Sequence, residues 1–203
     1  YTSPPSTPIP YTLLLPTTYL PDISVPLASD LSLASRGGLT SSSPTYALPP
    51  RRPKSSLLPS AAFGPPRSPD PTAENVSIVI STVADGFGIR RNLGEPTFAG
   101  EFLLANVLSG KGRKARLLSA VSVPSGSIGS SSSEGVGEEM YRFDYVVDRS
   151  GVAGGGMVGN VRAATVVGEK DGNKIITMTV VVPEGEGGKL GIVEEVAGSF
   201  RLL

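Results

Sequence analysis

The stretch that decides the fold is NVRAATVVGEKDGNKIITMTVVV, residues 160–182. Two runs rich in β-branched residues flank the dipeptide Asp171-Gly172. β-Branched side chains favour strands, and Asp-Gly is a strong hairpin signal because both residues tolerate a positive φ. The stretch therefore predicts two antiparallel strands joined at Asp171-Gly172.

A third strand is expected just before this hairpin, in EEMYRFDYVV, residues 138–147. Side chains alternate along a strand, so the three aromatic residues of YRFDY share one face. Arg142 and Asp144 share the other face, where they are either functional groups or ordinary polar neighbours. We expect the aromatic face to pack against a helix and the charged pair to meet neighbours near a second covering layer.

Further elements surround these three strands. Alternation and β-branched composition predict strands over NVSIVIST, residues 75–82, and ARLLSAVSV, residues 115–123. EPTFAGEFLLANVLSG, residues 95–110, is typical of a helix, because Pro96 suits the first turn and Gly110 can end it. Within this helix the apolar residues that recur at helical spacing are Phe98, Phe102 and Ala105.

The last stretch, residues 187–203, predicts a terminal helix with one apolar face. That face carries Leu190, Val193, Val196, Ala197 and Phe200. Several strands in series with one helix between them and one at the end indicate an α+β fold. We expect a mainly antiparallel sheet covered by helices.

The composition limits the function. Lys plus Arg and Asp plus Glu both total 18 in 203 residues, so the neutral chain lacks the basic excess that nucleic-acid binders use. It contains no Cys and no His, which excludes disulfides, thiolate and histidine metal sites, and Ser–His–Asp catalysis. No apolar run approaches the roughly 20 residues of a membrane-spanning helix.

The N-terminal part differs from the rest, since 16 of the 19 prolines lie at or before Pro71. Proline removes a backbone donor and disfavours helix, so this part is not a packed domain of regular elements alone. We predict three regions: a segment 1–23 that contributes a first strand in YTLLLP, an extended Pro/Ser-rich insertion 24–71, and a main domain 72–203. The alternative for the insertion is a flexible loop.

The insertion carries apolar residues and the one basic cluster of this half. These groups are either contacts for a partner or, for the charges, ordinary solubilising residues. The predicted partner-binding residues are Arg51, Arg52, Lys54, Leu57, Leu58, Phe63 and Arg67.

Two other patterns favour simpler interpretations. GGGMVG, residues 154–159, matches a dinucleotide-binding spacing, but the residues that follow are β-branched rather than helical, which favours a hairpin loop. An acidic group including Glu134, Glu139 and Asp144 lacks the ligand spacing of a calcium loop. We expect a solvated surface there.

The order of these segments resembles the PsbP family of thylakoid lumen proteins. NVSIVIS, a Gly-Glu-Pro-led helix, LLSA, YRFDYVV, the DGNK hairpin and VEEVAGSFRLL follow one another as in that family. YTLLLPTTYLP resembles its first strand. The resemblance covers residues 72–203 and about 11–22.

The resemblance implies an α-β-α sandwich around an antiparallel sheet and no enzymatic activity. It implies a location in the chloroplast thylakoid lumen after transit-peptide removal, and a peripheral association with a photosystem core and its lumenal extrinsic subunits. It implies no cofactor of the chain's own, but indirect retention of calcium and chloride. The departures are the insertion at about 24–62, Tyr19 where a tryptophan is usual, and a long Ser/Gly loop at 124–137.

Three functions remain open at this point. The first is an extrinsic lumenal subunit of a photosystem, with photosystem II favoured. The second is a transient assembly factor or a photosystem I accessory subunit. The third is an enzyme that uses carboxylates or Lys, which the absence of His, Cys and a convincing acid pair disfavours.

Overall fold

The computed structural model describes residues 1–21, 59–66, 74–109, 112–124, 139–151 and 159–203. The described residues form a seven-stranded antiparallel sheet in the order β2-β3-β4-β8-β7-β6-β5. Its five long strands are β4 (Asn75–Thr82), β5 (Lys114–Pro124), β6 (Glu139–Asp148), β7 (Val161–Lys170) and β8 (Lys174–Pro183).

Short strands complete the β-structure. β2 (Leu20–Pro21) and β3 (Ala61–Gly64) extend the main sheet beyond β4. β1 (Tyr11–Thr12) and β9 (Arg201–Leu202) pair with each other in a separate two-stranded sheet, so the N-terminal segment is held by the last residues of the chain.

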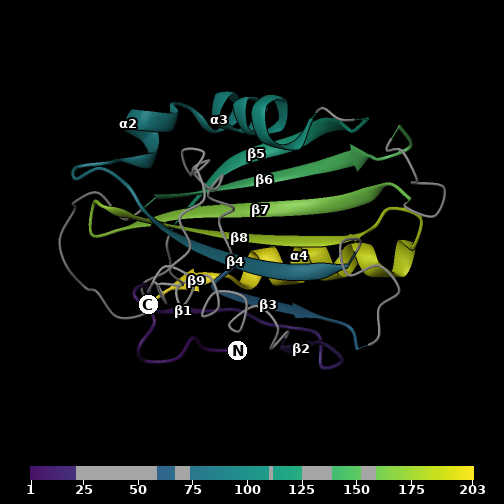
Figure 1. The fold of residues 1–203 in the computed structure, drawn as a ribbon, viewed down its shortest axis with the longest axis horizontal. Helices are drawn as coiled ribbons and strands as arrows, with labels where there is room; N and C mark the ends of the chain where they lie inside the picture. The colour runs from purple at the N-terminus through teal and green to yellow at the C-terminus, as the bar shows by residue number, and fades with distance from the viewer. Residues whose placement is uncertain (22–58, 67–73, 110–111, 125–138, 152–158) are drawn as a thin grey trace, which may run out of the picture.

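Helices lie on both faces of the sheet (Figure 1). α2 (Ile89–Leu93) and α3 (Pro96–Leu103) pack on β5 and β6, and a π-helical turn, η1 (Leu104–Leu108), continues α3. α4 (Leu190–Ser199) follows a short 3₁₀ turn, η2 (Gly187–Lys189), and packs on β7 and β8. The expected α-β-α sandwich is confirmed. In the described part of the chain, no helix has the length and apolar character needed to cross a membrane.

The two faces of the sheet have separate cores. Under α2 and α3, the aromatic side of β6 packs with residues of β7, so Tyr141, Phe143 and Tyr145 face the helices as the alternation predicts. On the other side, α4 and the N-terminal segment share one core with β4, β7 and β8. Ile9, Tyr11 and Leu13 are each at most 1% exposed there, so the N-terminal segment is a component of the core.

The hairpin predicted at Asp171-Gly172 is present. β7 and β8 pair along their whole length: Val161 lies opposite Pro183 at one end, and Lys170 lies opposite Lys174 at the turn. Asp171 has φ 60° and Gly172 has φ 66°, the positive values that a primed hairpin turn requires. The local sequence is therefore sufficient to explain this pairing.

The helix expected over 95–110 forms, but it presents a different face to the sheet. Phe98 and Phe102 are 64% and 60% exposed, and Ala105 is also exposed, so these residues are not the buried stripe. The buried side carries Ala99 and Gly100 instead. In α4 the predicted face is buried except for Leu190, which is 42% exposed at the start of the helix.

The short strands correct the sequence interpretation in two ways. The first strand covers only two residues, Tyr11–Thr12, rather than the whole of YTLLLP, and it lies outside the main sheet. Residues 61–64 fall in the predicted insertion 24–71 but form β3, which pairs with β4. Most of the insertion lies outside the described residues, so its remaining boundaries stay a prediction.

Candidate functional site

Only one of the predicted partner-binding residues can be placed. Phe63 lies on β3 and is 3% exposed, which assigns it to the core rather than to a partner-facing surface. The others, namely Arg51, Arg52, Lys54, Leu57, Leu58 and Arg67, lie outside the described residues. The GGGMVG motif and Glu134 lie mostly or wholly outside them as well.

Arg142 and Asp144 form an ionic cluster between β6 and α4. Arg142 donates from Nη2 to Asp144 Oδ1 at 2.9 Å and from Nε to Asp144 Oδ2 at 3.1 Å. The same guanidinium pairs with Glu194 on α4. Ser119 on β5 donates its hydroxyl to Asp144 Oδ2 at 2.8 Å. The cluster therefore ties two strands of the sheet to the helix that covers them.

The charges in this cluster satisfy one another. Burial lowers the pKa of Arg142, but hydrogen bonds to Asp144 and Glu194 outweigh it, so that pKa is raised. Asp144 is 5% exposed and accepts hydrogen bonds from Arg142 and Ser119, so both of its carboxylate oxygens have partners. The expectation that this pair meets neighbours near a covering layer is confirmed, and its arrangement is structural.

A second ionic cluster attaches the N-terminal segment to the start of α4. The Tyr19 hydroxyl donates to Glu74 Oε1 at 3.0 Å, and Lys189 Nζ lies 2.6 Å from Glu74 Oε2. Lys189 also pairs with Glu186 at 2.8 Å, and hydrogen bonds to Glu186 and Glu74 raise its pKa. The Tyr19 hydroxyl therefore binds a buried carboxylate. A tryptophan, which the family resemblance leads one to expect at this position, could bind it only through its indole N–H.

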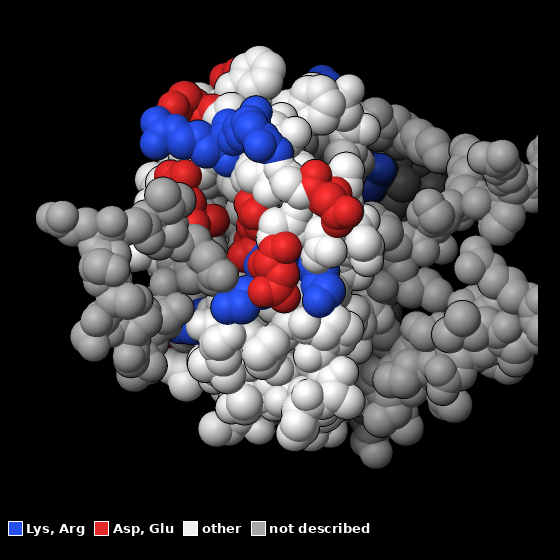
Figure 2. Space-filling view, turned by 90° about the vertical axis from the view of Figure 1, so that its left-hand side faces the viewer, with Lys and Arg blue, Asp and Glu red and all other residues white. Residues whose placement is uncertain are grey.

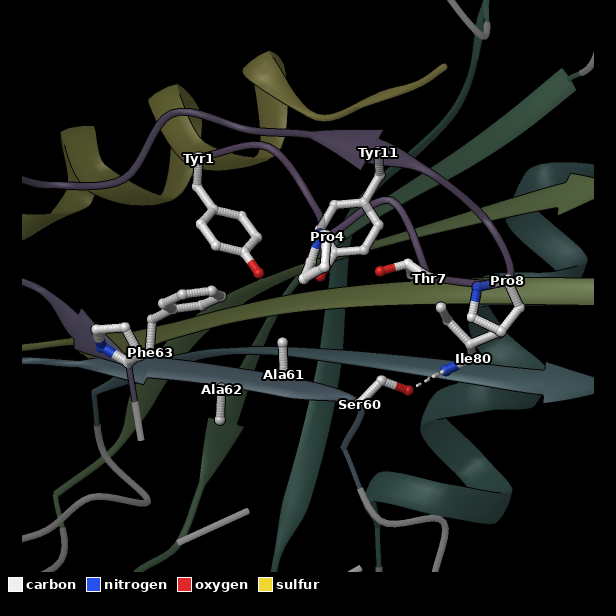
Figure 3. A pocket seen from close by; sticks show the side chains of 11 residues that line it. Tyr1, Pro4, Thr7, Pro8, Tyr11, Ser60, Ala61, Ala62, Phe63 and Ile80 are labelled. Atoms are coloured by element: carbon white, nitrogen blue, oxygen red, sulfur yellow. Dashed lines mark hydrogen bonds between the residues drawn. The ribbon is translucent and has the colours of Figure 1, made fainter. Parts of the chain in front are cut away.

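A mainly apolar cavity lies between the N-terminal segment and β3 (Figure 3). Its volume is about 370 Å³. The rings of Tyr1 and Phe63 meet edge to face, with centroids 4.7 Å apart. Its lining residues are Tyr1, Pro4, Thr7, Pro8, Tyr11, Pro21, Ser60, Ala61, Ala62, Phe63 and Ile80.

The cavity suits an uncharged, largely apolar group. Among the described residues no charged side chain lines it, and the polar side chains that line it carry hydroxyls, such as those of Thr7 and Ser60. Burial, followed by the influence of Tyr1, raises the pKa of Tyr11, so its phenol stays neutral. Because its walls come from segments up to 79 positions apart, from Tyr1 to Ile80, no local sequence pattern could have revealed it.

Charges of both signs are mixed on one face of the molecule. On the side of the molecule that Figure 2 shows, positive and negative side chains lie beside one another in the upper part, and the lower part has few of either. An example is the exposed pair Arg90–Glu95 at 2.7 Å. Within the described ranges, no three acidic side chains lie close enough to hold a metal ion. This mixture of charges agrees with the neutral composition, which lacks the basic excess of a nucleic-acid-binding face.

Comparisons with known proteins address the fold. No model of a protein family matches this chain, and no curated protein sequence matches it. A similar solved structure is the cyanobacterial PsbP (CyanoP) of Synechocystis sp. PCC 6803, which is 18% identical with a TM-score of 0.54. The match covers 95% of this chain and 86% of that one. The PsbP-like fold expected from the sequence is confirmed.

A second solved structure with some likeness is LpqN, a protein involved in cell envelope biogenesis of Mycobacterium tuberculosis. It is 13% identical with a TM-score of 0.46, and the match covers 100% of this chain and 89% of that one.

Proposed function

We propose that this chain is a non-enzymatic extrinsic subunit of photosystem II, located on the lumenal face of the thylakoid membrane. The observation that carries the proposal is the PsbP-like fold, shared with cyanobacterial PsbP over 95% of the chain. The order of sequence segments, from NVSIVIS to VEEVAGSFRLL, supports it independently of the structural comparison.

The chemistry of the described residues is compatible with a binding role. The buried charges, Asp144 and Glu74, are held by Arg142 and Lys189, so they stabilise the sheet and its helices. The described surface supplies no cluster of acids for a metal. Retention of calcium and chloride would then follow from covering the oxygen-evolving side, without a calcium site of the chain's own.

The proposed attachment also uses the insertion 24–71. A proline-rich chain loses less conformational entropy on docking than a flexible one, so its apolar residues and Arg51, Arg52 and Lys54 are the proposed contacts. Deleting residues 24–58 should weaken attachment and leave the thermal unfolding of the remaining chain cooperative. Loss of folding and attachment together would argue against a docking role for this segment.

The test of the function is fractionation of native thylakoids in mild detergent, with this chain quantified in each photosystem band before and after a high-salt wash. Stoichiometric presence in oxygen-evolving photosystem II, with loss of oxygen evolution on its release and recovery on re-addition, is the expected result. Trace amounts confined to immature complexes would instead identify an assembly factor. A band shared only with photosystem I would identify an accessory subunit of that complex.

A further inference from the structure

Helix α3 is packed with its small side facing the sheet. A Cβ added at Gly100 would lie 3.0 Å from Phe143 Cδ1 and 3.1 Å from Leu117 Cδ1, so both side chains would have to shift to admit it. Ala99 beside it is 7% exposed. Because the small residues face inward, the two large aromatic residues of the helix are left on the outside.

The outward side of α3 is a continuous apolar strip. Phe98 and Phe102 are 64% and 60% exposed and lie four positions apart, on the same side of the helix. The helix then widens into the π turn η1, where Ser109 N donates to Leu104 O, five residues back. Val107 in this turn is also a large apolar residue that is 59% exposed. Single exposed apolar residues are common, whereas two large rings one helical turn apart mark a candidate contact surface.

The charges of this segment disfavour a lipid surface as the occupant. Residues 96–108 contain one acid, Glu101, and no Lys or Arg. Helices that lie on membranes carry basic residues on their polar side, which bind anionic headgroups. A helix with an exposed carboxylate between its two phenylalanines lacks that attraction.

The area of the strip is too small to form a stable interface by itself, with a second copy of the chain or with another protein. An aromatic side chain buries about 150–250 Å² when fully covered, so two rings exposed by about 60% offer roughly 250 Å². A stable specific interface needs about 800 Å² from each partner. Two rings of this kind match the buried centre of a larger interface, whose rim is formed by other surfaces.

Glu101 indicates the charge on the partner. At the start of α3, Glu95 already has a charged partner, because it forms an ion pair with Arg90 at 2.7 Å. Glu101 is exposed, and among the residues that the structure describes it makes no ion pair. A basic side chain at the rim of the partner's cleft would complement it.

We infer that Phe98 and Phe102 are the anchors by which this chain docks into an apolar cleft of a photosystem II protein subunit, with a Lys or Arg at the rim of that cleft facing Glu101. This inference rests on the proposed function and names its contact surface. Its residues are other than the predicted contacts of the Pro-rich insertion, and α3 lies on the opposite side of the sheet from the N-terminal segment 1–21.

The test compares the full-length wild type with Phe98→Gln/Phe102→Gln in re-binding to salt-washed photosystem II membranes. Both substitutions are at exposed helical positions, so the unfolding midpoint should change by roughly 2 °C or less. Affinity should fall on the order of 30-fold or more, as for buried aromatic anchors. The matched control is Leu14→Gln/Leu20→Gln, which removes two leucines 58% and 55% exposed elsewhere, and it should bind as the wild type does. Glu101→Lys should weaken binding about fivefold.

Each outcome decides a separate point. If the aromatic variant binds as the wild type does, the α3 anchor is wrong and the proposed function stands. If the wild type itself does not re-bind, the proposed function fails and this inference fails with it. If the wild type binds protein-free phosphatidylglycerol vesicles and the aromatic variant does not, the strip is a lipid-binding surface. A wild-type dimer in sedimentation that the aromatic variant abolishes would assign it to self-association, and either result overturns the protein-cleft inference.

Discussion

Replacing Arg142 by Met should destabilise the protein more than any substitution at its exposed ion pairs. Asp144, 5% exposed, would lose its charged partner and keep only the Ser119 hydroxyl at 2.8 Å. Breaking a buried ion pair from one side costs about 3–5 kcal/mol, because the remaining charge is buried without compensation. Since Ser119 still donates, we expect about 3 kcal/mol, at the lower end of that range.

The assay is urea unfolding followed by circular dichroism, with thermal unfolding beside it. A loss of about 3 kcal/mol corresponds to a midpoint roughly 6–12 °C lower in a chain of this length. Glu194→Gln is the first control, because the Glu194 side chain is 61% exposed and its pair should contribute at most about 1 kcal/mol. The second control is Arg142→Met/Asp144→Leu, which removes both charges and should recover most of the loss. A single Arg142→Met variant within about 1 kcal/mol of the wild type would refute the reasoning.

Three further predictions concern the packing and the buried phenols. Gly100→Ala should lower the free energy of unfolding in urea by about 1–3 kcal/mol, because the new Cβ meets Phe143. The matched control is Gly191→Ala in α4, whose Cβ meets no atom within 4 Å and which should raise that free energy by about 0.5–1 kcal/mol. Equal effects of the two substitutions would contradict the close approach of α3. Gly172→Val should lower the free energy of unfolding by about 1 kcal/mol or more, because position 172 has φ 66°, which a β-branched residue adopts only with strain. Amide hydrogen exchange should become faster first at the turn between β7 and β8. Unchanged exchange there would contradict a strained turn. Burial raises the pKa of four tyrosines in the folded protein above the ordinary value of 10.0. Their contribution to the free energy of unfolding is therefore complete below pH 10 and is lost as the pH rises from 10 through their pKa values in the folded state. Their phenolate absorbance should therefore appear together with alkaline unfolding, and ionisation before unfolding would contradict their burial. These tyrosines are Tyr11, Tyr19, Tyr141 and Tyr145.

Elements whose physics is local could be predicted from the sequence. The β7–β8 hairpin follows from two β-branched runs and a dipeptide that tolerates positive φ, and all of these signals lie within one short stretch. The buried side of α4 follows in the same way from apolar spacing, apart from Leu190 at its first turn. The aromatic face of β6 follows from alternation alone.

Elements that depend on distant partners could not be predicted. β1 and β9 cover two residues each and exist because Tyr11 pairs with Leu202, nearly the length of the chain away. β3 lies among residues whose proline content favours an irregular segment, and its pairing with β4 decides its structure. The cavity beside Phe63 depends on the same distant contacts.

The sequence by itself determined the five long strands, the hairpin between β7 and β8, helices α3 and α4, and the α+β class, because alternation, helical spacing and turn residues act over a few positions. The tertiary structure alone decided which side of α3 faces the sheet. The helix has two apolar sides, one with Phe98 and Phe102 and one with Ala99 and Gly100. A Cβ at position 100 would lie 3.0 Å from Phe143 and 3.1 Å from Leu117, closer than ordinary contact, so the small side fits against the sheet and the aromatic side faces outward. That choice depends on the surface of the sheet, which the helix sequence does not contain.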